Sequence, residues 1–314
     1  MTESSGKVQT MRSLGVAAYG MDVMYTGLAA NMRAIQTAGW TSIILGMLHP
    51  HASGDVWYNN TQILSGGSYI GRAAWPGELL KLNQSGKIRL LATVGGAPPW
   101  VDDFANIKSI YQKNKNSFAG TLLQRNFQVL FDTLPIISEI DMDVEETYDQ
   151  PSFVAFCQML NQIGFDITFC PYENDSFWTG SLKALNKTNP GAVRWWNLQC
   201  YAGGNRNVPQ DWATEITNAI PGFNTTDFIL ASDWSRFLAK PASNPASWYW
   251  DGDCPPAVQR SLAQLKATCV GGGFIWNIDQ ILGYAASQKE KADPIPCGNV
   301  GMNDYVTAIT QALG

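Results

Sequence analysis

The feature that most constrains the fold of this chain is a regular alternation of short apolar runs and helical segments. Eight such pairs follow one another without a long linker or a low-complexity tract. The predicted strands are 14–19, 42–48, 88–94, 136–145, 165–170, 193–201, 228–231 and 273–278. The predicted helices are 28–39, 76–84, 118–134, 151–163, 176–185, 211–220, 257–267 and 303–313. Strands that alternate with helices form parallel sheets. Eight units predict an α/β fold of the (β/α)8 (TIM) barrel type, one domain over residues 1–314 with a flexible tail at 1–12.

Composition narrows the class of function. The chain has 314 residues, 45% of them hydrophobic and 15% charged, which is enough for one large core. A net charge of −5 leaves no basic footprint, so nucleic acid is not an expected partner. No apolar run reaches the roughly 18 residues of a membrane span. The N-terminus lacks a signal-peptide pattern. Localisation is left open between an internal protein, a removed leader and another export route.

The segment 137–145 alternates apolar and acidic residues with period two, as expected for a strand with two different faces. Asp141, Asp143 and Glu145 share one face, and three neighbouring carboxylates there repel one another and resist desolvation. Active sites use such crowding to keep one carboxyl protonated while its neighbour stays charged. An exposed edge strand and a cation site built from three carboxylates are the alternatives.

Chemistry in a (β/α)8 barrel sits at the carboxyl ends of the strands. Those ends carry aromatic, acidic and amide side chains together with a glycine pair. They are Tyr19, Asp22, Gly95, Gly96, Glu145, Tyr172, Glu173, Gln199, Tyr201, Asp233, Trp234 and Trp276. Aromatic faces mixed with carboxylates suit a neutral, ring-shaped, hydroxyl-rich ligand. No GxGxxG or Walker pattern follows the glycine pair, so we expect no nucleotide cofactor.

Twelve tryptophans are an unusually large number for this length. Core packing accounts for some of them, and of the adjacent pair Trp195 and Trp196 one should face the helices. Others fall in segments predicted as loops or at their edges, where tryptophan often serves recognition. These are Trp57, Trp100, Trp178, Trp248 and Trp250.

The acidic strand resembles that of glycoside hydrolase family 18, the chitinases and endo-β-N-acetylglucosaminidases. The family signature is D-G-x-D-x-D-x-E, and residues 138–145 read S-E-I-D-M-D-V-E. Three further short motifs agree in order and placement. They are Thr93-Val94-Gly95-Gly96 for S-x-G-G on the third strand, Gln199-Cys200-Tyr201 for Gln-x-Tyr on the sixth, and Trp276 on the eighth.

This resemblance implies a retaining glycosidase that acts on β-linked N-acetylglucosamine in chitin or an N-glycan core. The acetamido oxygen of the substrate is the nucleophile in that family. Glu145 would be the general acid and base. Asp143 would bind the acetamido N–H and share a proton with Asp141, while Tyr201 would hold the acetamido oxygen. Trp276 would form the floor of the sugar site.

Two residues depart from the family signature. Ser138 stands in place of its first Asp, and Glu139 in place of its glycine. Glu139 shares the parity of the acidic triad and should point into the barrel, where it needs a cation such as Arg89 or must stay neutral. The departures keep a second hypothesis open, a barrel that binds carbohydrate with weak or no turnover. A third hypothesis is an unrelated barrel enzyme that uses a divalent cation at Asp141 and Asp143.

The remaining candidates for metal and redox chemistry are few. Six cysteines show no CxxC or zinc-finger spacing. Cys254 and Cys297 lie in loop-like sequence and could pair, whereas Cys157, Cys170 and Cys200 lie in or beside regular elements, where buried free thiols are the default. The histidines at 49 and 51 begin a long polar loop predicted over 49–74. Histidines in such a loop are more often solvated than metal-bound, and we expect no metal.

Overall fold

The computed structural model describes residues 14–84, 86–97, 101–201, 207–221, 228–239, 249–287 and 297–314. The predicted flexible tail at 1–12 lies outside these residues, as do Trp100 and Trp248. Across the described part of the chain, no helix is both long enough and apolar enough to cross a membrane.

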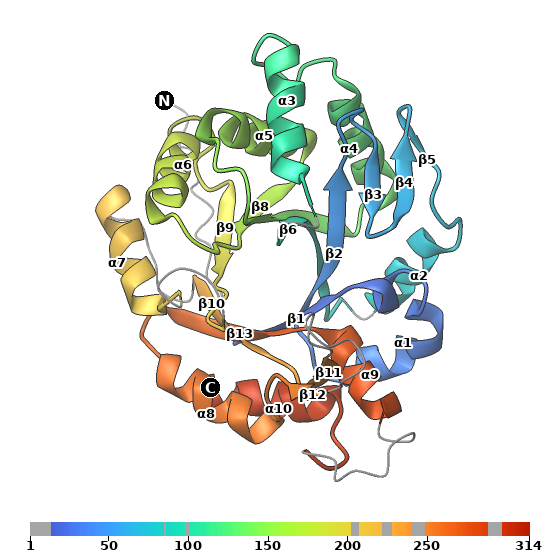
Figure 1. Ribbon diagram of the computed structural model, residues 1–314, viewed down its shortest axis with the longest axis vertical. Coiled ribbons are helices and arrows are strands. Elements are labelled where there is room, and N and C mark those ends of the chain that lie inside the picture. The colour runs from blue at the N-terminus through green and yellow to red at the C-terminus, as the bar shows by residue number, and fades with distance from the viewer. Residues whose placement is uncertain are drawn as a thin grey trace.

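Eight parallel strands close into a ring, with the helices outside it (Figure 1). The strands are β1 (Gly15–Gly20), β2 (Ser42–Pro50), β6 (Arg89–Gly96), β7 (Ile137–Val144), β8 (Asp166–Phe169), β9 (Val193–Asn197), β10 (Ile229–Trp234) and β13 (Val270–Trp276). Closure comes from β1, which pairs with β2 on one side and with β13 on the other. The predicted (β/α)8 barrel is therefore confirmed.

The helices follow the strands around the ring. They are α1 (Leu28–Thr37), α2 (Trp75–Leu82), α3 (Asp103–Lys113), α4 (Leu122–Thr133), α5 (Gln150–Ile163), α6 (Asp175–Thr188), α7 (Pro209–Ala219), α8 (Pro255–Leu265), α9 (Ile278–Ser287) and α10 (Met302–Leu313), with a 3-10 turn, η1 (Asp22–Met24), after β1. Capping residues and glycines in the sequence determine where helices begin and end, as α5 illustrates. The side chain of Asp149 caps α5, and Gly164 ends it at a φ of +128°. The sequence reading omitted α3 and α9.

The segment 49–74 is not a long loop. It continues β2 and then forms three short antiparallel strands, β3 (Val56–Tyr58), β4 (Thr61–Ser65) and β5 (Ser68–Tyr69), which extend the sheet from β2. Asn59 at a φ of +48° and the pair Gly66-Gly67 make the turns. Such Asn and Gly turns between short apolar stretches are a hairpin signal that the polar composition concealed.

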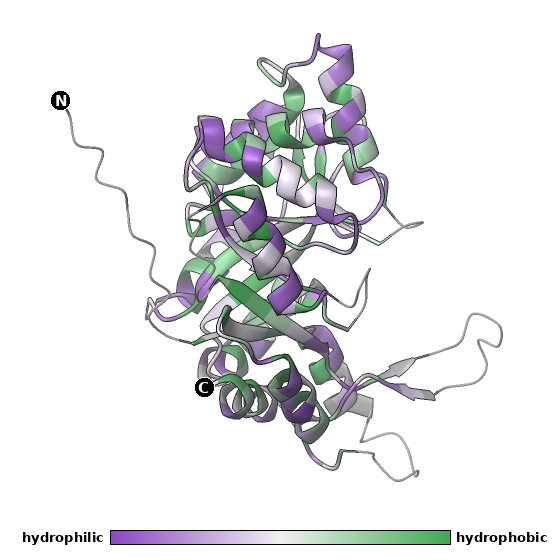
Figure 2. Ribbon diagram, turned by 90° about the vertical axis from the view of Figure 1, so that its left-hand side faces the viewer, coloured by the Kyte–Doolittle hydropathy of each residue, from purple (hydrophilic) through white to green (hydrophobic). Residues whose placement is uncertain are grey.

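The core has two layers, separated by the barrel wall. Outward-facing strand residues pack against the apolar faces of the helices, and this layer contains Trp196. A smaller inner cluster fills the barrel and contains Tyr19, Trp195 and Phe274. The split of the adjacent tryptophans between the two layers confirms the prediction from strand parity. Figure 2 shows apolar colour on the strands and mixed colour on the helices, as expected for buried strands and for helices with one face in solvent.

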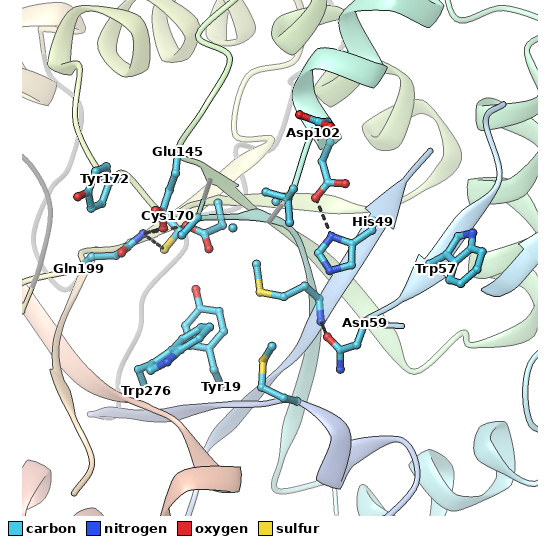
Figure 3. Close-up of a pocket in the computed structure, with 18 of the residues that line it drawn as sticks. Tyr19, His49, Trp57, Asn59, Asp102, Glu145, Cys170, Tyr172, Gln199 and Trp276 are labelled. Atoms are coloured by element: carbon cyan, nitrogen blue, oxygen red, sulfur yellow. Dashed lines mark hydrogen bonds and ion pairs between the residues drawn. The ribbon is translucent and has the colours of Figure 1, made fainter. Parts of the chain in front are cut away.

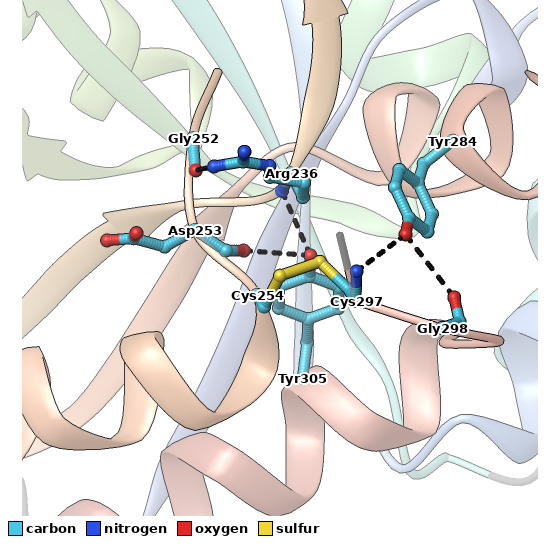
Figure 4. Close-up of a disulfide and its surroundings, with 8 residues drawn as sticks. All are labelled: Arg236, Gly252, Asp253, Cys254, Tyr284, Cys297, Gly298 and Tyr305. Carbon is cyan, nitrogen blue, oxygen red and sulfur yellow. Dashed lines mark hydrogen bonds between the residues drawn. A yellow bond between two sulfur atoms is a disulfide. The ribbon is translucent and has the colours of Figure 1, made fainter. Parts of the chain in front are cut away.

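A disulfide joins Cys254 to Cys297, as the loop-like sequence around both residues allowed. Cys254 precedes α8, and the backbone N–H of Cys297 donates to the hydroxyl of Tyr284 on α9 (Figure 4). The Tyr305 hydroxyl of α10 donates to the carbonyl of Asp253. The bond thus ties the last helices together. Nearby, β11 (Phe237–Ala239) and β12 (Tyr249–Asp251) form a separate two-stranded ribbon that the sequence reading missed.

Candidate active site

The inward face of β7 carries the predicted row of acids, and Asp141 is its deepest member at the centre of the barrel. Asp141 is fully buried, and its carboxylate accepts three hydrogen bonds from side chains of β1, β8 and β9. The donors are the Tyr19 hydroxyl at 2.6 Å, the Thr168 hydroxyl at 2.5 Å and the Asn197 amide at 2.9 Å. Burial raises the pKa of Asp141, and these donors act in the opposite direction by stabilising the charged form.

Asp143 and Glu145 lie nearer the mouth, where both line the cavity and one donor bridges them. The Gln199 side-chain nitrogen donates to both, at 2.8 Å to Asp143 and 3.0 Å to Glu145. Burial, and then the charge of Glu145, raise the pKa of Asp143. Burial also raises the pKa of Glu145. The two carboxyls therefore favour holding a proton between them.

The expected proton sharing between Asp141 and Asp143 stays a prediction. Hydroxyl and amide donors of β1, β8 and β9 contact Asp141, whereas Gln199 contacts Asp143 together with Glu145. Sequence parity placed all the acids on one face, but it could not show which donors from other strands contact each of them.

Aromatic rings surround these carboxyls in one cavity of about 970 Å³. Trp276, at the end of β13, lies 5.2 Å from Tyr19 between ring centroids. Tyr201 stacks on Trp234 at 5.1 Å and an interplanar angle of 18°. Figure 3 shows Glu145 and Gln199 on one side of the cavity, with Trp276 and Tyr19 below them. The structure thus brings the predicted acid, the predicted tyrosine and the predicted sugar floor to the same cavity.

Gly95 and Gly96 also line this cavity, as do Tyr172 and Asp22. Both glycines have φ near +120°, at +118° and +127°. A side chain on Gly95 would collide with the backbone carbonyl of Asp143. A glycine at this position is therefore what allows β6 to run so close to the acidic strand.

Two predicted contact residues do not line this cavity. Asp233 is buried on β10 but does not line the cavity, because alternate residues of a strand face opposite sides and Trp234 takes the inward position. Burial raises the pKa of Asp233 to about 6. Glu173 is exposed, does not line the cavity either, and accepts a hydrogen bond at its backbone carbonyl from Trp178.

Of the tryptophans predicted for recognition, only Trp57 among the described ones reaches the cavity. Trp178 is fully buried within α6 and packs against Trp196, so its placement in a recognition loop was wrong. Trp250 lies on β12 against Tyr284.

Sequence reasoning missed the arm of the cavity under the β2–β3 hairpin. His49 is part of β2 and is not a solvated loop residue. Its ring Nδ1 lies 2.8 Å from the carboxylate of Asp103, the first residue of α3. His51 stacks on Trp57 nearby. Burial raises the pKa of Asp103 despite this histidine. The apolar run 43–48, which leads directly into His49, was the available signal.

At the other end of β7, Glu139 is fully buried and pairs with Arg89 at 2.6 Å, the partner expected for it. The Ser138 hydroxyl donates to its second oxygen at 2.5 Å. The Arg89 guanidinium also lies over the Trp195 ring, 5.0 Å from the centroid. Burial raises the pKa of Glu139, and Arg89 opposes that shift. Both departures from the family signature thus belong to one ion-pair cluster.

Within the described residues, no group of three or more His, Cys, Asp or Glu side chains has the arrangement of a metal site. No family model matches the sequence, and a search of curated proteins finds no related sequence. Comparison with solved structures is informative.

A GH18 chitinase from Pseudoalteromonas aurantia aligns over 95% of this chain and 100% of its own, with a TM-score of 0.58 and 12% identity. The chain has the fold of the GH18 chitinases. A chitinase from Bacteroides thetaiotaomicron gives a TM-score of 0.59 at 11% identity over 95% of this chain and 97% of its own. The group IV chitinase of Ostrinia furnacalis, solved with allosamidin, gives 0.57 at 10% identity over 95% and 98%.

Proposed function

We propose that this protein is a divergent GH18 glycosidase that hydrolyses β-linked N-acetylglucosamine, with the substrate's own acetamido group as nucleophile. One observation carries the proposal: Asp143 and Glu145 share the Gln199 donor, in a cavity that Tyr201 and Trp276 also line. An acid, an adjacent carboxylate, a hydroxyl and an aromatic floor are the groups this reaction requires.

In the first step, the acetamido oxygen attacks the anomeric carbon and forms an oxazolinium ring as the glycosidic bond breaks. Glu145 gives its proton to the leaving oxygen. Its raised pKa favours the acid form nearer neutral pH than an exposed glutamate would allow. In the second step, water adds to the same carbon, its proton returns to Glu145, and the ring opens.

The other groups hold the acetamido group and its developing charge. Asp143 accepts the acetamido N–H and, as a carboxylate, stabilises the positive charge of the oxazolinium. The Tyr201 hydroxyl donates to the acetamido oxygen and aligns it for attack. Trp276 offers an apolar face to the sugar ring. Asp141, fixed by three donors, lies beneath the site and holds the base of the acidic row in place.

The test replaces the acid. Glu145→Gln keeps the shape and the contact with Gln199 but removes the transferable proton. Hydrolysis of an N-acetylglucosamine oligomer should fall by at least about 100-fold while the oligomer still binds. Glu215→Gln, an exposed change on α7, is the matched control and should leave the rate unchanged. Unchanged turnover in Glu145→Gln would refute the assignment.

A carbohydrate-binding protein without turnover is the second candidate, and Ser138-Glu139 in place of the family's Asp-Gly is the observation that favours it. Measuring binding and hydrolysis of the same oligomer with the unmodified protein separates the two. Binding without cleavage selects the second candidate.

A further inference from the structure

We propose that Glu146 is a positioning residue that holds Glu145 in place for proton transfer, by tying the end of β7 to the first turn of α3. This inference rests on the proposed function, in which Glu145 is the general acid and base. Glu146 itself does not line the cavity. It would therefore act through the main chain that it shares with Glu145, and not by contact with the sugar.

The main chain at Glu145 lies beyond the regular pairing of β7. The strand ends at Val144, which pairs with Gly96 of β6. On its other side, β7 pairs with β8 only as far as Met142. Residues 145 and 146 then form a bend. The ladder of the barrel therefore does not fix the main chain from which the Glu145 side chain projects.

The side chain of Glu146 caps α3 from another part of the chain. Its Oε1 atom accepts from the backbone N–H of Phe104 at 2.6 Å and from that of Ala105 at 3.3 Å. N–H groups in the first turn of a helix have no partner within the helix. The side chain of Asp102, which precedes α3, makes no capping hydrogen bond. Glu146 thus takes the role of the N-cap residue, and a carboxylate is favourable at the positive end of the helix.

The first turn of α3 is a firm support for this contact. Asp103 already ties it to a histidine of β2. The side chain of Asn106 adds a hydrogen bond to the carbonyl of Pro50 on β2, at 3.1 Å. Toward α5, which lies beside α3 (Figure 1), the buried ring of Phe104 is 6.0 Å from that of Phe153 between centroids. Because β2 and α5 both hold this turn, its N–H groups are a fixed anchor for Glu146.

A second contact holds the same connection further along. Lys108, one turn beyond Phe104 on α3, lies 3.1 Å from Asp149. Asp149 in turn caps α5 by accepting from the backbone N–H of Ser152 at 3.2 Å. The Lys108 side chain is 38% exposed, so solvent weakens that ion pair. The two backbone hydrogen bonds of Glu146, which a carboxylate strengthens, are therefore the main restraint at the end of β7.

This restraint matters because proton transfer requires Glu145 to lie within hydrogen-bond reach of the glycosidic oxygen. Gln199 contacts the carboxyl end of the Glu145 side chain at 3.0 Å. Glu146 fixes the other end, at the main chain. Without the cap, the Glu145 carboxyl would spend less time in its place at the cavity. A displacement of about 1 Å at a reacting group can lower a rate by about 100-fold.

The test compares Glu146→Ala with the unmodified protein on the same N-acetylglucosamine oligomer. We expect kcat to fall about tenfold and KM to change by less than about twofold, because Glu146 does not touch the ligand. The alkaline limb of the pH profile of kcat, which reports loss of the proton from Glu145, should move to lower pH. Burial raises the pKa of Glu145, and a carboxyl held less firmly in the cavity is better solvated. The titratable groups that act on it, Asp143 and Glu173, are unchanged in this variant.

Further variants separate positioning from helix stability. Glu146→Gln keeps an oxygen that can accept from both N–H groups and should recover most of the turnover. Thr121→Ala is the matched control, because it removes the cap of α4, where the Thr121 hydroxyl accepts from the backbone N–H of Gln124 at 3.2 Å. It should lower the melting temperature by a few degrees, as Glu146→Ala does, and leave kcat and its pH profile unchanged. If Glu146→Ala does not fold, Glu146→Asp, which is one methylene shorter, must show the same shift of the alkaline limb.

An unchanged kcat and an unchanged pH profile in Glu146→Ala would overturn this inference, because the cap would then serve stability alone. The proposed function would still stand if Glu145→Gln abolishes turnover in the same assay. If the unmodified protein does not cleave the oligomer, the proposed function fails and this role of Glu146 fails with it.

Discussion

The two ends of the inward face of β7 treat buried carboxylates in opposite ways. At the bottom of the barrel, Glu139 is closed off from solvent and neutralised by Arg89 and Ser138. At the mouth, Asp143 and Glu145 face a cavity and share the neutral donor Gln199, and neither forms an ion pair with a cation among the described residues. Asp141 lies between, satisfied by uncharged donors.

This difference assigns a structural role to the buried end of β7 and a chemical role to the end at the cavity. At the bottom, the Arg89 cation opposes the rise in the pKa of Glu139 that burial causes, which suits a structural ion pair. Two neighbouring carboxyls without a cation tend to retain a proton, and placing them together lowers the stability of the folded protein. Mutations at the bottom of the barrel should therefore change the free energy of unfolding alone. Mutations at the mouth should change both turnover and the free energy of unfolding, and the change in unfolding free energy should have the opposite sign to that at the bottom.

The largest expected effect on stability is at the bottom. Arg89→Met leaves Glu139 buried without its cation, and the free energy of unfolding at neutral pH should fall by about 2 kcal/mol. That figure allows for solvent screening, because the Arg89 side chain is 41% exposed. Urea denaturation measures it. The double variant Arg89→Met with Glu139→Gln should regain most of the loss. A single variant as stable as the parent would show that the pair contributes little.

A smaller effect of opposite sign is expected at the mouth. The folded state raises the pKa of Glu145, so it binds the proton more tightly than the unfolded chain does. Stability then falls as pH rises from the ordinary glutamate pKa through the raised one. Glu145→Gln should therefore raise the melting temperature by a few degrees at neutral pH, and the gain should vanish in acid, where both states are protonated. Thermal denaturation at the two pH values measures this. A loss of stability at neutral pH would contradict the account.

The barrel and the placement of most candidate site residues could be predicted from the sequence, because both depend on the periodicity of apolar and polar residues. Alternating strands and helices predicted the ring, and parity within β7 predicted the inward acids and the need of Glu139 for Arg89. Parity also explains why the predicted contact residue Asp233 does not line the cavity: adjacent residues such as Asp233 and Trp234 cannot both face inward.

What the sequence did not reveal depends on contacts between distant segments. The pairing of His49 with Asp103 joins β2 to α3, and the arm under the hairpin exists only because β3 folds back on β2. The partner of Asp143 likewise depends on which donors β8 and β9 present to Asp141. None of these three relations is marked by a pattern in the local sequence.

The central claim is that the acetamido group of the substrate reacts beside Asp143 and Glu145. The most direct measurement is proton NMR of the first product formed from a tetrasaccharide of β-linked N-acetylglucosamine, with the β-linked glucose tetrasaccharide in parallel. The account predicts that only the acetylated oligomer is cleaved and that the new reducing end appears first as the β anomer. An initial α anomer, or equal cleavage of the glucose oligomer, would contradict it.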